Sequence, residues 1–394
     1  MRGFLRMAAM ALLAAFVTAS AYLAGFAVQF TLSPPPMESS ATALEDQFEV
    51  FWEAWGIIQQ EFYGDVPSPQ RMTYAAIQGV VDTLGDPHTV FVDAAHAAIL
   101  NDDLSGAFEG IGAVVEMRDG QLVIVSPLKD TPAQRAGLRA GDVVMAIDGR
   151  PTEGLSLFEA ISLIRGRKGT IVRLTIHRPE AGEPLTLEIV RDRIELPVVE
   201  SEMLEGDTAY LKLFSFNGRA TPAVKSALQQ LLAQEPRGLI LDLRDNPGGF
   251  LHVAVEVASQ FVNEGLILTE VGRDGVEREH PALKGGLATD IPLAVLVNKG
   301  TASAAEIVAG AIQDHGRGVL IGEGTFGKGS VQVTHELSDN SSLRVTTARW
   351  FTPSGHQIHG QGLRPDIEVV LTEEDRANDR DPQLERAVEY IRRW

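Results

Sequence analysis

The sequence predicts a multi-domain α/β protein. From Leu196 to the C-terminus, apolar strand-like runs alternate with amphipathic helical runs, which is the pattern of a layered α/β domain. Residues 106–180 instead contain short alternating runs separated by turn residues, which predicts a small β-rich domain with two helices. Residues 44–105 have apolar residues at helical spacing and predict a small helical unit. A chain of 394 residues is long enough for one to three domains.

The composition excludes several classes of function. The formal net charge of −19 argues against a nucleic-acid partner, which would require a basic surface. The chain has no cysteine, so disulfides, zinc–thiolate sites, iron–sulfur clusters and a cysteine nucleophile are ruled out. The histidines are scattered and include no H-E-x-x-H motif, so we expect neither a bound metal nor a cofactor.

The N-terminal segment predicts export. Two arginines precede an uncharged apolar run, Met7–Leu32, which as a helix is long enough to cross a bilayer. The "ASA" at residues 19–21 also fits a signal-peptide cleavage site. Because the apolar run continues past it, we favour an uncleaved signal anchor over residues 1–32, followed by a stiff linker over residues 33–43. The rest of the chain is then expected outside the cytoplasm, held at the cell membrane, or secreted or periplasmic if the segment is cleaved.

Two helices are predicted in the unit that follows the linker, over Leu44–Tyr63 and Thr73–Gly85. The first carries large apolar residues at helical spacing, and such residues more often form a core or a contact between chains than a ligand site. We therefore expect a core contact or a homodimer contact from Phe48, Phe51, Trp52, Trp55 and Ile58.

Residues 106–180 contain two alternating runs that meet at Asp119-Gly120, a hairpin signal. The following "SPLKDTPAQRAGLRAGDVVMAIDG" is very similar to a PDZ domain in the strand order found in bacterial proteases. The resemblance implies that the domain binds an extended C-terminal peptide as an added strand, with the terminal carboxylate on backbone N–H groups. "EGIGA" matches the carboxylate-binding loop, so the candidate substrate-binding residues are Gly110, Ile111 and Gly112. A simple glycine turn is the alternative interpretation.

The glycine-rich stretch "GEGTFGKGSVQ", residues 322–332, first suggests a phosphate-binding loop. A P-loop requires Ser or Thr after its lysine and then a helix, but Gly329 follows Lys328 and the next residues alternate as in a strand. Nucleotide binding is therefore disfavoured. If the strand includes the lysine, Lys328, Ser330 and Gln332 share one face. A buried lysine with a lowered pKa can act as a general base.

The motif "PLAVLVNKGTASAAEI" brings a serine to the junction of a buried strand and a helix. This position exposes the Ser303 hydroxyl in the manner of a nucleophile elbow. The Ala304 N–H, at the start of the helix, is free to donate to an oxyanion. However, Ser303 and Glu306 also fit a capping box, S-x-x-E. The motif alone does not decide between a nucleophile and a helix cap.

The motif "LILDLRDNPGG" predicts a buried strand followed by a rigid turn that ends in Gly248 and Gly249. Because glycines let a substrate approach the backbone closely, one of their N–H groups is a candidate second oxyanion donor. An ordinary strand–helix loop is the alternative.

Five motifs follow one another in the order typical of the carboxyl-terminal processing peptidases, also called tail-specific proteases. The sequence resembles this family in "LGDPHTVFVD", "LILDLRDNPGG", "VNKGTASAAEI", "GEGTFGKGSVQ" and "TTARWFTPSGHQIHGQGLRPDIEV". The resemblance implies a ClpP/crotonase-like protease core over residues 181–371 and a C-terminal helical tail over residues 372–394. It also implies that Ser303 is the nucleophile, Lys328 the general base and Gln332 the residue that orients the lysine.

By the same resemblance, the oxyanion N–H groups come from Ala304 and from Gly249 or, less directly, Gly248. Arg165 corresponds to a PDZ arginine that in some members links peptide binding to the active site, and His88 matches a position interpreted as structural. We therefore expect a serine endopeptidase that cleaves exported proteins near flexible C-terminal tails. The alternative is a catalytically silent PDZ adaptor that only binds C-terminal peptides.

Overall fold

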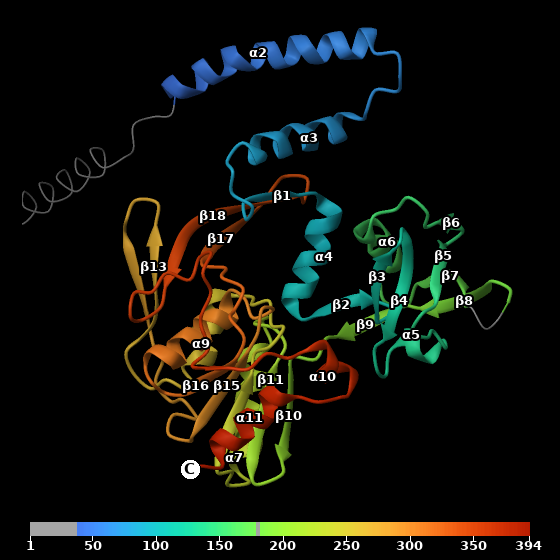
Figure 1. The fold of residues 1–394 in the computed structure, drawn as a ribbon. Coiled ribbons are helices and arrows are strands. Elements are labelled where there is room, and N and C mark those ends of the chain that lie inside the picture. Colours follow the sequence, from blue (N-terminus) through green and yellow to red (C-terminus); the bar gives the residue numbers. More distant parts are fainter. Residues whose placement is uncertain (1–37, 179–181) are drawn as a thin grey trace, which may run out of the picture. The chain divides into compact units, whose positions relative to one another are not determined.

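The computed structural model describes residues 38–178 and 182–394 (Figure 1). The predicted signal anchor, residues 1–32, lies outside the described residues, as does the start of the predicted linker. None of the helices that the structure describes is both long and apolar enough to cross a membrane. The chain divides into two compact units, Met1–Thr73 and Tyr74–Trp394.

The described part of the first unit consists mainly of helix α2 (Glu38–Glu61). The sequence predicts its start at Leu44, but the helix already includes the last residues of the predicted linker. Large apolar side chains along and just after this helix are exposed, and Trp52 and Phe62 are each 59% accessible. A core role for this face is therefore not met within the described residues, and the homodimer contact stays a prediction. Helix α3 (Pro69–Asp82) crosses the boundary between the units.

The predicted PDZ domain contains a sheet in the order β3-β4-β5-β7-β8, with β6 paired to β5. The hairpin at Asp119-Gly120 forms with both residues at positive φ (51° and 77°), as a type I′ turn requires. The last strand, β8, pairs with β7, so the sheet continues past residue 180, where the sequence places the boundary. The elements are β3 (Ala113–Arg118), β4 (Gln121–Pro127), α5 (Pro132–Arg135), β5 (Val143–Ile147), β6 (Arg150–Pro151), α6 (Leu157–Ile164), β7 (Ile171–His177) and β8 (Leu185–Val190).

Two short strands connect this domain to the rest of the second unit. Strand β2 (Ala107–Gly110), which follows helix α4 (Ala94–Ser105), pairs antiparallel with β9 (Asp192–Glu195). The chain segments that enter and leave the PDZ sheet are therefore hydrogen-bonded to each other.

A six-stranded sheet in the order β10-β11-β12-β15-β16-β19 forms the centre of the predicted protease core. Only β10 is antiparallel to its neighbour, and the other strands run parallel. Strands β12 and β15 are buried along their whole length, which explains why their sequences read as continuous apolar runs. The strands are β10 (Val199–Leu204), β11 (Thr208–Leu213), β12 (Gly238–Asp242), β15 (Leu293–Val297), β16 (Val319–Gly322) and β19 (Ile367–Glu368).

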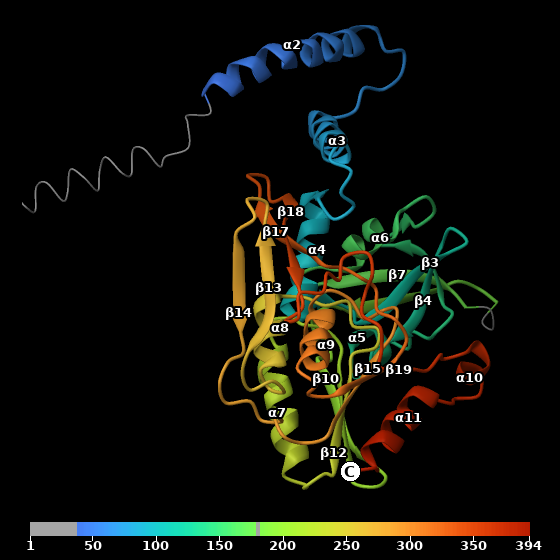
Figure 2. The ribbon, with the colours of Figure 1, turned by 60° about the vertical axis from the view of Figure 1, so that its left-hand side comes forward.

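Helices cover both faces of this sheet. Side chains such as Leu241 pack on one face with helices α7 (Ala220–Leu232), α8 (Leu251–Ala258) and α9 (Ala304–Asp314). On the other face, Ile240 packs against helix α11 (Pro382–Ile391), and Figure 2 shows α7 and α11 on opposite sides of the strands. The predicted C-terminal helix is thus a layer of the core, since its inward residues Ala387 and Ile391 are fully buried, and the short α10 (Glu373–Ala377) precedes it.

A second sheet contains strands from distant parts of the chain, in the order β1-β18-β13-β14, with β17 also paired to β18. The first of these strands precedes the PDZ domain, and Val90 on it is the partner of Arg344 on β18. Buried Leu268 and Trp350 of this sheet belong to the same apolar core as helices α7 to α9. The strands are β1 (Val90–Val92), β13 (Leu266–Gly272), β14 (Glu277–Pro281), β17 (Ser330–Glu336) and β18 (Ser342–Phe351).

Candidate active site

Three of the sequence motifs follow neighbouring parallel strands. The "DNPGG" loop follows β12, the serine turn follows β15, and the glycine-rich loop follows β16. Because the carboxyl ends of adjacent parallel strands meet at one edge of a sheet, these three loops come together there. The fold therefore places the candidate nucleophile, base and oxyanion donors in one region.

Ser303 has an unusual backbone conformation, with φ 55° and ψ −117°. An ordinary N-cap residue is extended, whereas positive φ in a residue with a side chain costs about 1–3 kcal/mol and marks functional turns. A strained strand-to-helix turn is the geometry of a nucleophile elbow. The turn is held by Thr301, whose hydroxyl donates to the Leu243 carbonyl (2.8 Å) and accepts the Asn298 N–H (3.0 Å).

Glu306, the acid of the capping box, has a second set of contacts. Its fully buried carboxylate accepts the Ser303 N–H (2.8 Å), as a capping box requires. The same carboxylate accepts the Lys328 N–H (2.9 Å), the Gly327 N–H (2.7 Å) and the Thr325 hydroxyl (2.6 Å). One carboxylate therefore ties the backbone of the candidate nucleophile to the loop that carries the candidate base.

The two candidate oxyanion donors lie on loops that touch. The side-chain oxygen of buried Asn246 accepts a hydrogen bond from the Gly248 N–H (2.9 Å), and the Asn246 backbone carbonyl accepts one from the Ala302 N–H (2.9 Å). A Cβ on Gly248 would lie only 2.8 Å from the Ala304 nitrogen. Within the described residues, the N–H groups of Ala304 and of exposed Gly249 have no acceptor. Of the two glycines, Gly249 is therefore the one with a donor available to a substrate.

Lys328 is more than half buried. Burial, with a smaller contribution from the positive charge of Arg344, lowers the pKa of Lys328 below that of an ordinary lysine. Its backbone carbonyl accepts the Trp350 indole N–H at 3.2 Å and its own N–H is bound by Glu306, so the peptide groups on both sides of the Lys328 Cα are fixed. A lysine in this setting has a larger neutral fraction near neutral pH, which a general base requires.

Gln332 is held by its amide nitrogen, which donates to the Ser330 hydroxyl (2.8 Å) and to the Thr346 hydroxyl (3.3 Å). Strand β17 begins at Ser330, so Lys328 belongs to the preceding loop and the predicted strand face does not extend to it. Among the described residues, no hydrogen bond joins the Lys328 ammonium group to Ser303 or Gln332. Catalytic hydrogen bonds are often long without substrate and shorten when it binds.

In the predicted carboxylate-binding loop of the PDZ domain, the backbone carbonyl groups already accept hydrogen bonds. The Ile111 carbonyl accepts the Ala133 N–H (2.8 Å), and the Gly112 carbonyl accepts the Leu128 N–H (2.9 Å). The Thr131 hydroxyl, which makes no capping bond to α5, also donates to the Gly112 carbonyl (2.9 Å). Within the described residues, the Ile111 and Gly112 N–H groups are left without an acceptor.

Next to this loop is a groove of about 130 Å³. Arg165 lies at the groove with its guanidinium carbon 4.3 Å from the centroid of the Phe108 ring, and it donates to the Ile99 carbonyl of α4 at 3.3 Å. The groove is mainly apolar and is lined by Phe108, Ile111, Gly112, Ala113, Val115, Ile161, Ile164 and Arg165. All four predicted PDZ contact residues are in or beside it, because Gly110 precedes Ile111 in the chain.

Comparisons with known proteins agree with this arrangement. Residues 207–369 match peptidase family S41, and residues 123–178 match the PDZ domain. The carboxy-terminal-processing protease of Bartonella bacilliformis is 42% identical over 312 residues, which cover 78% of this chain and 71% of the relative. The chain belongs to the carboxy-terminal processing proteases. It is therefore a serine peptidase of family S41.

Other members of the family support the assignment. The carboxy-terminal processing protease CtpA of Bacillus subtilis is 35% identical over 334 residues, covering 85% of this chain and 71% of the relative. Among solved structures, the photosystem II D1 C-terminal processing protease is 31% identical with a TM-score of 0.52, over 80% of this chain and 86% of that one. A putative S41 protease from Bacteroides fragilis, at 16% identity and a TM-score of 0.54, shares the fold over 84% of this chain and 92% of that one.

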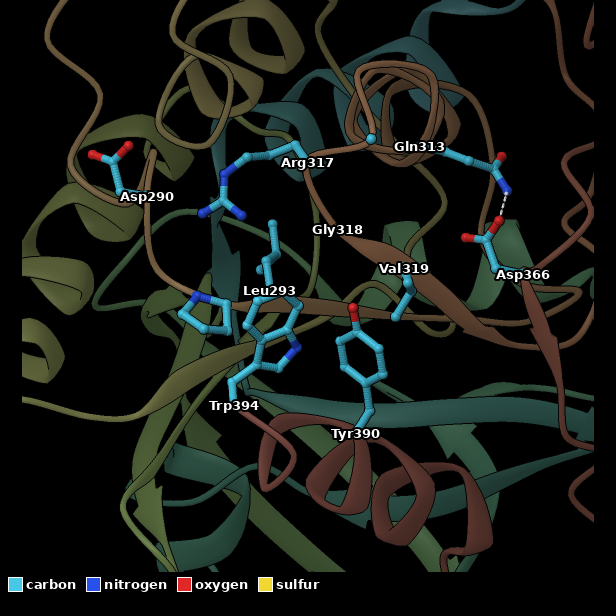
Figure 3. Close-up of a pocket in the computed structure, with 11 residues that line it drawn as sticks. Asp290, Leu293, Gln313, Arg317, Gly318, Val319, Asp366, Tyr390 and Trp394 are labelled. Atoms are coloured by element: carbon cyan, nitrogen blue, oxygen red, sulfur yellow. Dashed lines mark hydrogen bonds between the residues drawn. The ribbon is translucent and has the colours of Figure 1, made fainter.

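A larger cavity of this protease lies away from the candidate site. It has a volume of about 410 Å³ and is lined partly by Leu293 and Val319, the first residues of β15 and β16 (Figure 3). Ser303 follows the opposite, carboxyl end of β15. The cavity therefore adjoins the far end of the strands and is not the place where the three motif loops meet.

Proposed function

We propose that this protease cleaves peptide bonds with a Ser303–Lys328 dyad. The observation that carries the proposal is the Glu306 carboxylate, which holds Ser303 in a strained elbow and Lys328 on a loop beside it. Because burial lowers the pKa of Lys328, the lysine is suited to accept a proton from the serine hydroxyl. The capping function of Ser303 and Glu306 is then part of the catalytic arrangement rather than an alternative to it.

In the first step, neutral Lys328 removes the proton from the Ser303 hydroxyl, and Oγ attacks the carbonyl carbon of the substrate. The carbonyl oxygen becomes an oxyanion that accepts hydrogen bonds from the Ala304 and Gly249 N–H groups. Protonated Lys328 then gives its proton to the leaving amine as the peptide C–N bond breaks. In the second half, Lys328 deprotonates a water that attacks the acyl-enzyme ester, and protonated Lys328 returns the proton to the Ser303 Oγ as the ester bond breaks. Gln332 would orient the lysine throughout.

We further propose that the PDZ groove captures the C-terminus of the substrate. The terminal carboxylate would accept the Ile111 and Gly112 N–H groups, with Gly110 allowing its approach, while an apolar last side chain enters the groove near Ile161. Arg165 contacts α4, and it is therefore suited to communicate occupancy of the groove to the rest of the second unit. The substrates would be exported proteins with flexible, apolar C-terminal tails.

The proposal extends to location and assembly. The apolar segment over residues 1–32 would anchor the protease to the cell membrane with its catalytic part outside the cytoplasm, and the exposed apolar face of α2 would form a homodimer contact. Fractionation of cells and the molecular mass of the detergent-extracted protease test these two points.

The test of the dyad is cleavage of an unfolded protein substrate with an apolar C-terminus. Ser303→Ala and Lys328→Ala should each abolish cleavage while leaving the binding of a C-terminal peptide unchanged. If the wild-type protein binds the peptide but shows no turnover, the protein is a silent adaptor. Cleavage by either variant at the wild-type rate would exclude the dyad.

A further inference from the structure

The segment "DPHT", residues 86–89, lies far from the catalytic motifs in sequence but is bound to β18. Strand β1 starts one residue after Thr89 and pairs with β18, and the Thr346 N–H donates to the Thr89 hydroxyl (3.1 Å). Thr89 is only 5% exposed. On the adjacent strand, Gln332 is the cross-strand partner of Thr346. The segment therefore reaches the residue that is proposed to orient Lys328.

Asp86 accepts several hydrogen bonds in this region. The Thr89 hydroxyl donates to its carboxylate at 2.7 Å, and the His88 N–H donates at 3.2 Å. Burial alone would raise the pKa of Asp86, but hydrogen bonds from the Thr346 and Thr89 hydroxyls and the His88 N–H lower the pKa to about 2. Asp86 is therefore ionised at any pH at which a protease of this kind works, and an ionised carboxylate can only accept hydrogen bonds.

The ionised carboxylate fixes the residue that contacts Gln332. The Thr89 hydroxyl gives its single hydrogen to Asp86, so its oxygen can only accept, and it accepts the Thr346 N–H. The Thr346 hydroxyl oxygen, held in this way, accepts from the Gln332 amide nitrogen. The Ser330 hydroxyl likewise accepts from the Gln332 amide nitrogen. Both N–H bonds of that amide are then used. Its carbonyl oxygen is left as the group available to Lys328.

We propose that Asp86 is a positioning residue that acts through Thr89 and Thr346 to orient the Gln332 amide, so that Gln332 offers an acceptor to Lys328. This inference rests on the proposed dyad. An acceptor binds a lysine N–H and leaves the nitrogen lone pair for the proton of Ser303. A flipped amide would instead donate to that lone pair and compete with the serine. It would also disfavour the charged lysine, because two donors would face each other.

The decisive comparison is Thr346→Val with Thr346→Ser. Valine keeps the size of threonine but removes the hydroxyl, so we expect kcat to fall about tenfold, a fraction of the ~10²–10⁴-fold that a general base supplies. The rise of kcat/KM with pH should also move to lower pH, which a purely structural role would not cause. Serine keeps the hydroxyl and should restore both properties. Thr347→Val, the same change at the exposed next residue, is the matched control.

Other ionisable groups near the lysine must stay unchanged in this comparison. Arg344 and His88 lie near enough to Lys328 for their charges to interact with it, and the His359 ring is 6.0 Å from the His88 ring. None of these groups is altered by substitutions at Thr346. A shift of the pH profile in Thr346→Val can therefore be assigned to the environment of the lysine.

A double-mutant cycle tests whether Asp86 acts through Thr346. Asp86→Asn alone should lower kcat and move the pH profile as Thr346→Val does, whereas adding it to Thr346→Val should lower kcat no further. Additive losses, or a wild-type pH profile in Thr346→Val or Asp86→Asn, would overturn the inference. If Thr346→Val does not fold, Asp86→Asn against Thr346→Ser gives the same comparison. The dyad is judged separately, because activity in Ser303→Ala would refute it whatever happens at Thr346.

Discussion

Within the part of the chain that the structure describes, backbone N–H groups are left without an acceptor both in the PDZ loop and at the candidate active site, and the two places are built differently. In the PDZ loop, neighbouring carbonyls are hydrogen-bonded to α5 and the end of β4, which leaves the Ile111 and Gly112 N–H groups available. At the candidate active site, a buried carboxylate and a buried asparagine hold the loops, which leaves the Ala304 and Gly249 N–H groups available. The first place suits a carboxylate that already exists, and the second an oxyanion that exists only during reaction.

The difference predicts which kinetic property depends on each place. The PDZ loop is fixed mainly by backbone hydrogen bonds, so changes in its groove should affect substrate binding. The catalytic loops are fixed by side chains such as Glu306 and Asn246, so changes there should affect turnover. Substitutions that separate KM from kcat are therefore the way to challenge this comparison.

The largest effect is expected from Gly248→Ala. Its Cβ would lie 2.8 Å from the Ala304 nitrogen and 2.8 Å from the Ser303 Cβ, and φ at this position is 97°, which favours glycine. Displacing these loops should lower kcat by about 10²–10³-fold, as loss of an oxyanion donor does. The control is Gly324→Ala in the glycine-rich loop, where the added Cβ would lie 3.7 Å from its nearest neighbour, the Leu363 carbonyl oxygen. Equal activity of the two variants would contradict the account.

The next effect is expected from Glu306→Gln, which keeps the shape of the side chain. The NH₂ group of the new glutamine would then face backbone or hydroxyl donors that the carboxylate now accepts, and two donors cannot form a hydrogen bond. We expect the free energy of unfolding to fall by about 1–3 kcal/mol for the unsatisfied donors, and kcat to fall by about 10²-fold, within the range that a general base contributes. The control is Glu323→Gln, in the glycine-rich loop that follows β16, because its carboxylate is paired with the exposed ammonium group of Lys299; this change should alter neither quantity. Chemical denaturation and steady-state kinetics measure the two quantities.

Much of the candidate site could be predicted because its motifs are local. A buried strand, a turn and a helix can each be identified from sequence, and the carboxyl ends of parallel strands then bring Ser303 and the glycine pair together. The second role of Glu306 could not be found this way, since it depends on the glycine-rich loop reaching the start of α9. The capping-box motif identified the residue but not its other partners.

The second sheet was beyond prediction for a similar reason. Its pairing of Val90 with Arg344 joins residues on either side of the PDZ domain, and local periodicity has no information on such pairs. The amphipathic pattern of α11 likewise predicts a buried face but not which sheet covers it. Strand β8 was missed because the PDZ resemblance ended near residue 180, whereas the sheet includes one more strand.

A smaller effect is expected from Ile161→Asp in the PDZ groove. A charge on this apolar wall should weaken capture of an apolar C-terminus and raise KM for a tailed substrate by about tenfold, the equivalent of ~1.4 kcal/mol. Hydrolysis of a short peptide that does not occupy the groove should be unchanged. Lower activity toward both substrates would mean that the groove and the catalytic loops are not separable as described.

The central claim is that Lys328 acts as the neutral base of Ser303, and the rate of covalent labelling of Ser303 by a serine-directed fluorophosphonate tests it most directly. Because burial lowers the pKa of Lys328, the labelling rate should rise with pH through one ionisation below the ordinary lysine value of about 10.4 and then level off. Lys328→Ala should remove that ionisation and most of the labelling. A rise centred on the ordinary lysine value, or an unchanged profile in Lys328→Ala, would contradict the account.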